Sequence, residues 1–186
     1  MMRWTAAVVA ALLLILLAWG IVLYNRLVLR RNLAKEAWSG IDVQLKRRHD
    51  LLPKLVEVVR AYTSHERQVL QETVTARGAA LAAAASTGRA QAENALTGEL
   101  RNLLAVAEGY PDLKANASYL DLQRQISEIE EQIQYARRYY NGTVRDLNVL
   151  VDSFPSNLVA RRFGFSAMEY FEIELATRSE GPGLFR

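Results

Sequence analysis

The stretch over residues 116–154 constrains the fold of this chain more than any other part of the sequence. Two sets of residues recur in it every seven positions, offset by four, and only one of the ten side chains is polar. The two sets are Leu122, Ile129, Ala136, Thr143 and Leu150, and Ile126, Ile133, Tyr140, Leu147 and Phe154. Five unbroken heptads predict one long helix that packs along other helices, as in a coiled coil.

The ends and the solvent-exposed face of this helix can also be predicted. Either Asn116 or Ser118 can cap its start by accepting a backbone N–H, and Pro155 ends it because proline has no N–H to donate. Asn141-Gly142 is a turn dipeptide, but the heptads keep their phase across it, so one continuous helix is predicted. The predicted solvent-exposed face consists of Glu128, Glu130, Glu131, Gln132, Arg137 and Arg138.

A second feature is the uncharged run of twenty residues over positions 4–23. As a helix this run spans about 30 Å, the thickness of the hydrocarbon layer of a bilayer. A cleaved signal peptide is the alternative, but the apolar run continues through residues 21–23, past the nearest match to a cleavage site at Ala18-Trp19-Gly20. We therefore predict a transmembrane anchor over residues 1–25, a helical body over 26–175 and a disordered tail over 176–186.

Positive charge follows this run directly, at Arg26, Arg30, Arg31 and Lys35. The positive-inside rule then places the body of this single-pass membrane protein in the cytoplasm and its N-terminus outside. The net charge of +3 is uneven, because residues 1–50 hold eight of the 23 Lys and Arg residues but only three of the 20 Asp and Glu residues. The basic character belongs to the membrane-proximal end, so we expect no nucleic-acid partner.

The remaining sequence predicts further helices. Apolar rows continue in phase after the anchor, so the membrane helix is predicted to run to about His49. These rows are Leu27, Ala34 and Ile41, and Trp38, Leu45 and Leu52. Asp50 and Pro53 predict a break and a restart, followed by helices over residues 52–85, 89–108 and 116–154 and a short helix over 156–163. The predicted class is all-α: an antiparallel long-helix bundle of about four helices plus a short C-terminal helix, on one N-terminal transmembrane helix.

Residues with catalytic or metal-binding chemistry are few. The chain has no cysteine, and its two histidines, His49 and His65, are interpreted as solvated residues at helix ends. A Ser-His-Asp set would have to come from Ser64, His65 and Asp50, without the strand-turn-helix motif that surrounds such a nucleophile. We therefore predict no catalytic residue, no metal, no cofactor and no small-molecule substrate.

Two basic groups are the candidate binding residues. The group beside the membrane consists of Arg26, Arg30 and Arg31, and the group further along the same helix consists of Lys46, Arg47 and Arg48. The first group either contacts anionic lipid headgroups or acts only as a topology signal. The second lies about 30 Å beyond the membrane end of the helix, so it forms either a solvated charge run or a contact for a protein partner.

Five segments of the chain together resemble the LemA family of bacterial membrane proteins. They are YNRLV (24–28), EAWSGIDVQLKRRHDLLPKLVEVV (36–59), AEGYPDLKAN (107–116), ARRYYNGTVRDLN (136–148) and FPSNLVARRFGFSAMEYFE (154–172). The resemblance implies an antiparallel helical bundle on a single N-terminal anchor. The family has no established biochemical activity, so it implies no catalytic residues, and one relative from magnetosome-forming bacteria points to a role in membrane organisation.

The sequence therefore favours a membrane-anchored scaffold or adaptor that is not an enzyme. Its expected partners are the lipid bilayer and either other proteins or further copies of the chain. The alternatives are an accessory subunit of a membrane protease or of another membrane enzyme, or an enzyme whose site is not recognised.

Overall fold

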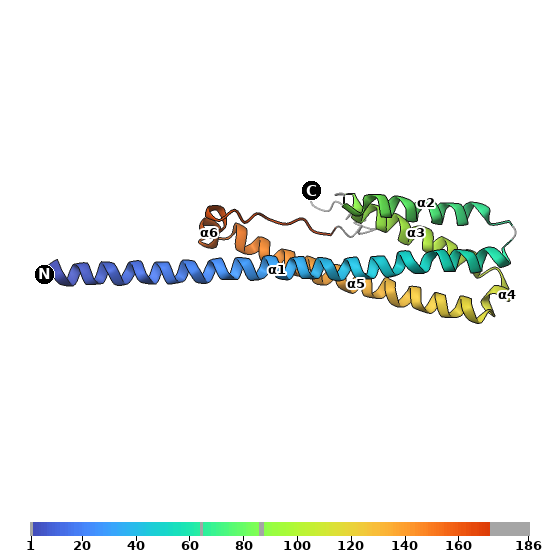
Figure 1. The fold of residues 1–186 in the computed structure, drawn as a ribbon, viewed down its shortest axis with the longest axis horizontal. Coiled ribbons are helices and arrows are strands. Elements are labelled where there is room, and N and C mark those ends of the chain that lie inside the picture. The colour runs from blue at the N-terminus through green and yellow to red at the C-terminus, as the bar shows by residue number, and fades with distance from the viewer. Residues whose placement is uncertain (1, 64, 86–87, 172–186) are drawn as a thin grey trace, which may run out of the picture. The chain divides into compact units, whose positions relative to one another are not determined.

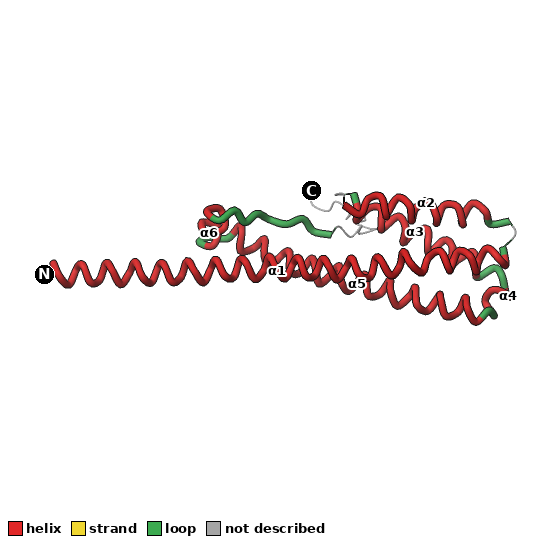
Figure 2. Tube along the Cα trace, in the orientation of Figure 1, coloured by secondary structure: helices red, strands yellow, loops and turns green. Residues whose placement is uncertain are grey.

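The computed structural model describes residues 2–63, 65–85 and 88–171. Figure 1 shows its ribbon, and Figure 2 shows the same view coloured by secondary structure. Within these ranges the regular structure is helical, and none of the described residues forms a strand. The predicted all-α class, with a long apolar helix at the N-terminus, is therefore confirmed.

Helix α1 runs without interruption over Met2–Tyr62, so the predicted break after His49 is wrong. The predicted single helix over residues 52–85 is wrong as well, because α1 ends at Tyr62 and the next helix begins at Arg67. Pro53 lies inside the helix and has no N–H, which leaves the carbonyl of His49 without its usual donor four residues later. Arg77, on helix α2 (Arg67–Ala82), supplies the missing donor: its Nε lies 2.9 Å from the His49 carbonyl oxygen. The helix continues through Pro53 because a neighbouring helix satisfies the carbonyl that proline leaves unbonded.

Contacts within the chain divide it into two compact units. We call Met1–Val43 with Ile133–Tyr170 the anchor unit, and Gln44–Gln132 with Phe171–Arg186 the bundle unit. Helices α1 and α5 (Ala117–Asp152) each contribute residues to both units. The sequence did not predict this division. The predicted extents of anchor and body stay predictions, and the predicted tail over 176–186 lies outside the described residues.

The bundle unit is built from four helices: the second part of α1, α2, α3 (Arg89–Ala107) and the first part of α5. The short elements η1 (Ala83–Ala85) and α4 (Pro111–Lys114) lie in its connections, and successive long helices run in opposite directions (Figure 1). Its core consists of Leu52, Leu55, Val56, Val59, Leu70, Ala80, Leu96, Leu100, Leu103, Ala107, Leu113, Tyr119, Leu122 and Ile126. Each long helix contributes a stripe at helical spacing, so the predicted antiparallel packing is realised in this unit.

The anchor unit packs the first part of α1 with the last part of α5, with α6 (Ser156–Arg162) and with residues 163–170. Its buried apolar cluster consists of Leu27, Leu147, Ala160 and Phe165. Side chains of α5 hold the segment that follows α6: the Asn148 amide exchanges two hydrogen bonds of 2.9 Å with the Met168 backbone. The Tyr140 hydroxyl also donates to the Glu169 carbonyl at 2.9 Å. An irregular segment is thereby fixed along a helix without forming a strand.

Helix α5 follows the heptad prediction closely. It passes through Asn141-Gly142 without a turn, and the Asn116 side chain caps its start by accepting the Tyr119 backbone N–H at 3.0 Å. The exception among the heptad positions is Phe154, which lies beyond the end of the helix and is 78% exposed, so its assignment to the seam is wrong. A straight helix drifts by about 20° per heptad, so the buried side moves away from a strict seven-residue repeat before the helix ends.

Candidate functional site

The bundle unit encloses a group of polar and charged side chains that we call the buried charged cluster. It consists of Arg48 and His49 on α1, Glu93 and Thr97 on α3, and Glu130 on α5. The first four residues are less than 10% exposed, and the Glu130 side chain is 21% exposed. Charged groups almost never occupy such positions unless they are paired, so the pairing within the cluster is what makes this burial tolerable.

Arg48 stands at the centre of the cluster and is 0% exposed. One guanidinium nitrogen, Nη1, donates to Thr97 Oγ1 and to Glu130 Oε1, each at 2.6 Å. The other, Nη2, forms an ion pair with the Glu93 carboxylate and lies 3.3 Å from the Glu93 backbone carbonyl. The planar guanidinium thus joins α1 to both α3 and α5. The prediction that Arg48 is solvated or faces a partner is wrong, because every part of its side chain is enclosed.

Glu93 accepts from two residues of α1. Its Oε2 faces Arg48, and its Oε1 lies 3.0 Å from His49 Nε2. An ionised carboxylate can only accept, so the imidazole nitrogen is the donor. Burial raises the pKa of the Glu93 carboxyl group, but the His49 hydrogen bond and the Arg48 charge outweigh it and leave the pKa below the ordinary value of 4.5. The carboxylate is therefore ionised inside the bundle at neutral pH.

His49 is 6% exposed, so the interpretation of this residue as a solvated helix end is wrong. The interpretation holds for His65, which is exposed in the connection between α1 and α2. His49 contributes to the cluster twice, through its imidazole to Glu93 and through its backbone carbonyl to Arg77. Because Arg77 lies on α2, all four helices of the bundle unit take part in this network.

Glu130 corrects the predicted solvent-exposed face of α5. Its Oε1 accepts from Arg48, and its Oε2 lies 3.4 Å from the Thr97 hydroxyl, so this carboxylate points into the bundle. Arg137 was placed on the same face but is only 2% exposed. The other predicted members are exposed: Glu128, Glu131, Gln132 and Arg138. Both exceptions directly follow the seam residues Ile129 and Ala136, where the drift of the helix brings the next position inward.

The geometry of the cluster favours a structural task. A buried ion pair contributes little net stability, but removing one partner costs about 3–5 kcal/mol because a charge is left buried and unpaired. The cluster thereby ties α1 to α3 and α5 in the register seen here, in which Arg48 pairs with both carboxylates. No group of three or more potential metal-binding side chains gathers anywhere in the described part of the chain.

The sequence contains a signal for the buried charged cluster that the predictions above missed. Arg48 and His49 occupy the helical step between the apolar residues Leu45 and Leu52, so one of them has to lie on the buried stripe. Glu93 stands likewise three residues before Leu96. Charged residues on an apolar stripe indicate buried pairing, but the stripe does not reveal which residue pairs with which.

The membrane-proximal arginines lie in the anchor unit and have three different environments. Arg26 is exposed. Arg30 forms an ion pair of 3.1 Å with Asp146, and the guanidinium of Arg31 lies 4.8 Å from the centre of the Phe165 ring. Arg30 and Arg31 thus take part in packing between elements, and Arg26 is the best placed of the three for a lipid headgroup. Lipid binding by these residues stays a prediction.

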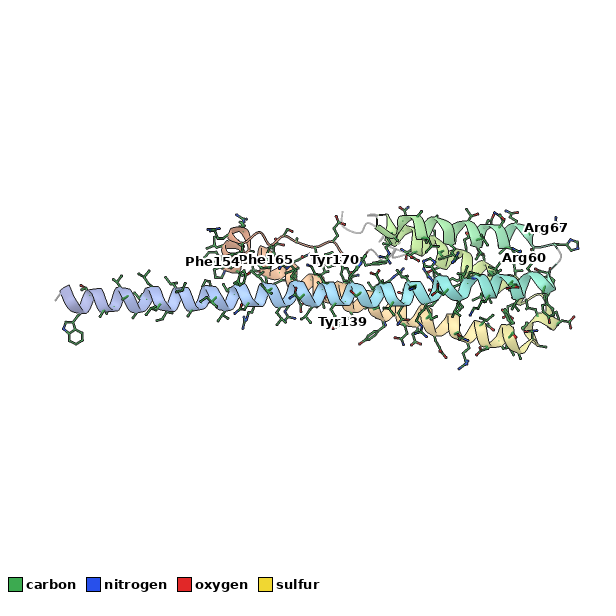
Figure 3. All side chains as sticks on the ribbon, in the orientation of Figure 1. Arg60, Arg67, Tyr139, Phe154, Phe165 and Tyr170 are labelled. Carbon is green, nitrogen blue, oxygen red and sulfur yellow. The ribbon has the colours of Figure 1, made fainter. Side chains whose placement is uncertain are left out.

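Two open grooves accompany these sites. The first lies in the anchor unit, has a volume of about 490 Å³, and is lined by Arg26, Leu29, Arg30, Asp146, Val149 and Leu150. The second lies in the bundle unit, has a volume of about 550 Å³, and is lined by Arg60, Thr63, Arg67, Leu70 and Gln71. Figure 3 labels Arg60 and Arg67, which come from α1 and α2. Lys46 and Arg47, the exposed members of the second predicted basic group, line neither groove.

The fold and these sites define a class of protein: a helical bundle whose first helix is long and apolar enough to cross a membrane. Helix α1 contains an 18-residue window of mean hydropathy 2.7, and 0% of that window is buried within the protein. The chain belongs to the LemA family, whose sequence profile matches residues 37–183.

Similar proteins agree with this assignment. The chain is 23% identical over 175 residues to magnetosome protein MamQ 2 of Paramagnetospirillum magneticum, and the match covers 80% of this chain. It is 26% identical over 156 residues to protein LemA of Metamycoplasma hominis, covering 80% of this chain and 68% of that protein. The chain spans 64% of the length of the magnetosome relative. Together with the apolar window of α1, these likenesses make the chain a membrane-associated protein of the LemA type.

Proposed function

We propose that this protein is a membrane-anchored scaffold or adaptor, which holds a helical surface at the bilayer for other proteins or for further copies of itself. Helix α1 carries the proposal, because one uninterrupted helix contains the apolar window and also supplies Leu52, Leu55 and Val59 to the core of the bundle unit. A flexible linker would let partners approach from any side, whereas a helix restricts the orientations that are available to them.

The buried charged cluster supports the same proposal. Its acidic and basic groups bind one another, and Arg48 and Glu93 are both too enclosed to reach a dissolved ligand. The surface left for partners consists of exposed residues such as Lys46 and Arg47. The similarity to proteins named as magnetosome proteins supports a role for this protein at a membrane compartment.

The orientation in the membrane is part of the proposal. Basic residues after the apolar run support a bacterial inner-membrane protein with its N-terminus outside and its helical units in the cytoplasm. Because the chain lacks cysteine, a single Ser118→Cys substitution reports the location of this exposed residue. The thiol should resist a membrane-impermeant reagent in whole cells and react after lysis. Equal labelling before and after lysis would place these units outside.

The scaffold role can be tested by site-specific photocrosslinking in intact cells. A crosslinker at Arg47 should give discrete adducts in the full chain, and a matched crosslinker at Arg101, an exposed arginine on α3, should not. Deleting residues 1–25 should abolish the Arg47 adducts while circular dichroism still reports a helical protein. Adducts that survive this deletion would reject membrane placement as the basis of partner binding. An Arg47 adduct with a protease subunit would instead favour the accessory-subunit alternative.

A further inference from the structure

A patch of exposed apolar and basic residues surrounds α6 in the anchor unit. We call it the α6 patch, and it consists of Phe154, Leu158, Arg161, Arg162 and Phe163. The exposed fractions of its apolar members are 78% for Phe154, 59% for Leu158 and 57% for Phe163. Figure 3 labels Phe154 beside α6. Three large apolar side chains are thus exposed within ten residues of sequence, and grouped exposed apolar side chains are a mark of interaction sites.

The inner face of α6 explains why these side chains point outward. Ser156 and Ala160, one helical turn apart, are buried, and Ala160 joins Leu27 and Phe165 in the apolar cluster of the anchor unit. The opposite side of the helix carries Leu158 with Arg161 and Arg162. A short surface helix ordinarily turns its apolar residues inward and its polar residues outward. Here the outward face is mixed, and it includes a leucine that the core of the unit does not use.

The position of the patch along α1 indicates which environment its exposed side chains meet. The Phe163 ring lies 4.9 Å from the Tyr24 ring, and the Phe165 ring lies 5.8 Å from Tyr24, both in edge-on contacts. Tyr24 is the first residue after the uncharged run over residues 4–23. The α6 patch is therefore level with the end of the membrane segment, where aromatic side chains favour the boundary between headgroups and acyl chains.

The charges of the patch suit the same environment. Residues 153–164 contain Arg161 and Arg162 and no acidic residue, and the exposed Arg26 follows the membrane segment on α1. The nearest acidic neighbour in sequence, Asp152, precedes this stretch. Arginines beside apolar rings match a layer in which anionic phosphates lie above acyl chains. The patch thus continues the membrane contact that α1 begins.

We propose that the α6 patch lies in the interfacial layer of the bilayer that α1 enters, and that it gives the protein a second, non-spanning membrane contact. This inference rests on the proposed membrane anchoring of α1. A single spanning helix can rotate about its axis and tilt in the bilayer, whereas a second contact at its end fixes which face of the anchor unit meets the lipid.

Depth-dependent fluorescence quenching tests this contact in the full chain. The absence of cysteine allows a single Leu158→Cys substitution, labelled with an environment-sensitive dye, in vesicles of phosphatidylcholine and phosphatidylglycerol. Tyr135→Cys is the matched control, because Tyr135 is 62% exposed and belongs to the same unit. Tyr135 lies on α5 near Tyr140, whose ring packs on Trp38. Trp38 is about 20 Å along α1 from Tyr24, so the control position is far from the end of the membrane segment.

Lipids that carry a nitroxide near the top of the acyl chain should quench the dye at position 158 several-fold more than the dye at position 135. Equal quenching at the two positions would overturn the proposal. The dye at position 158 could instead show a blue shift without lipid quenching, and this shift could fade as the protein is diluted in lipid. That result would show that a second copy of the chain covers the patch, and it would also overturn the proposal.

Two further measurements distinguish a failure of the membrane assignment from a failure of the proposal for the α6 patch. Flotation of the full chain with the vesicles reports whether the chain binds the membrane at all. Loss of flotation would overturn the membrane assignment itself, and a floating chain without quenching would overturn only the proposal for the α6 patch. Replacing both Arg161→Gln and Arg162→Gln should remove most of the dependence of quenching on phosphatidylglycerol. The control Arg138→Gln, at an exposed arginine of α5 outside the α6 patch, should leave this dependence unchanged.

Discussion

The two units of this protein differ in how far they enclose the ion pairs that connect their helices. In the bundle unit, the charges that connect helices are enclosed, as in the ion pair between Arg48 and Glu93. In the anchor unit, the ion pair between Arg30 and Asp146 is partly exposed. Further connections in that unit use rings and amides, such as the 5.2 Å contact between Trp38 and Tyr140 and the bonds between Asn148 and Met168. Buried ions demand one arrangement of their partners, whereas rings and amides tolerate small shifts. The bundle unit is thus expected to respond to charge and pH, and the anchor unit to packing.

The largest expected effect comes from removing the central charge of the bundle unit. Arg48→Ala leaves Glu93 buried without its cation, so we expect a loss of about 3–5 kcal/mol of stability. Arg47→Ala changes the exposed neighbour and should cost less than about 0.5 kcal/mol. Urea unfolding of the full chain, followed by circular dichroism, measures both. Equal shifts in the two variants would show that the buried charged cluster does not hold the bundle.

The pH dependence of stability sharpens the contrast between the units. Glu93 has a lower pKa in the folded protein than its ordinary value of 4.5, so its contribution is present above that pH and is lost as the pH falls below it. The charged or titratable groups facing it are Arg48 and His49 on α1, with Glu130 on α5 also bound to Arg48. Glu93→Gln should flatten this acid limb of a plot of unfolding free energy against pH. A limb of unchanged slope would contradict the assignment.

An intermediate loss of stability is expected when the hydrogen bond to the His49 carbonyl is removed. Arg77→Ala should cost about 1–3 kcal/mol, because Pro53 offers that carbonyl no N–H and the carbonyl would lose its donor. In a Pro53→Ala background the new backbone N–H can bond the carbonyl, so the same arginine substitution should cost clearly less. A double-mutant cycle of unfolding free energies measures the difference. Additive effects would mean that Arg77 does not compensate for the proline.

A smaller loss is expected in the anchor unit. Asn148→Ala removes both hydrogen bonds that hold the Met168 backbone, at an expected cost of about 1–2 kcal/mol. The amide does not ionise, so this cost should stay constant over the pH range in which the Glu93 contribution disappears. A cost that changes with pH would show that the anchor unit also depends on titrating groups, and the contrast between the units would fail.

The smallest effects are expected at two glycines of the anchor unit and should have opposite signs. Gly142→Ala lies inside α5, where an added Cβ meets no atom within 4 Å, so it should stabilise the protein by up to about 1 kcal/mol. Gly164→Ala should destabilise it by a similar amount, because Gly164 has a φ of +71° that alanine adopts with strain. Thermal melts that move in the same direction for both would contradict this account of α5.

The sequence predicted the fold best where neighbours along the helix carry the information. The heptads predicted α5 across Gly142, and the cap was predicted at Asn116 or Ser118 and is made by Asn116. These features depend on residues a few positions apart in sequence. The same reasoning failed at Pro53, whose local rule is to end a helix. The donor that overrules it comes from Arg77, 28 residues away in sequence.

The candidate sites divide in the same way. The apolar run and the arginines after it are visible in the sequence, and so is the presence of charge near the stripe of Leu45 and Leu52. The burial of Arg48 is decided only by tertiary structure, because Glu93 and Glu130 reach it across 45 and 82 residues of chain. A charge in a helix is solvated until another helix brings it a partner. The sequence by itself therefore determined which segments become helices and which of them is apolar enough for a membrane, whereas packing decided which charges are enclosed.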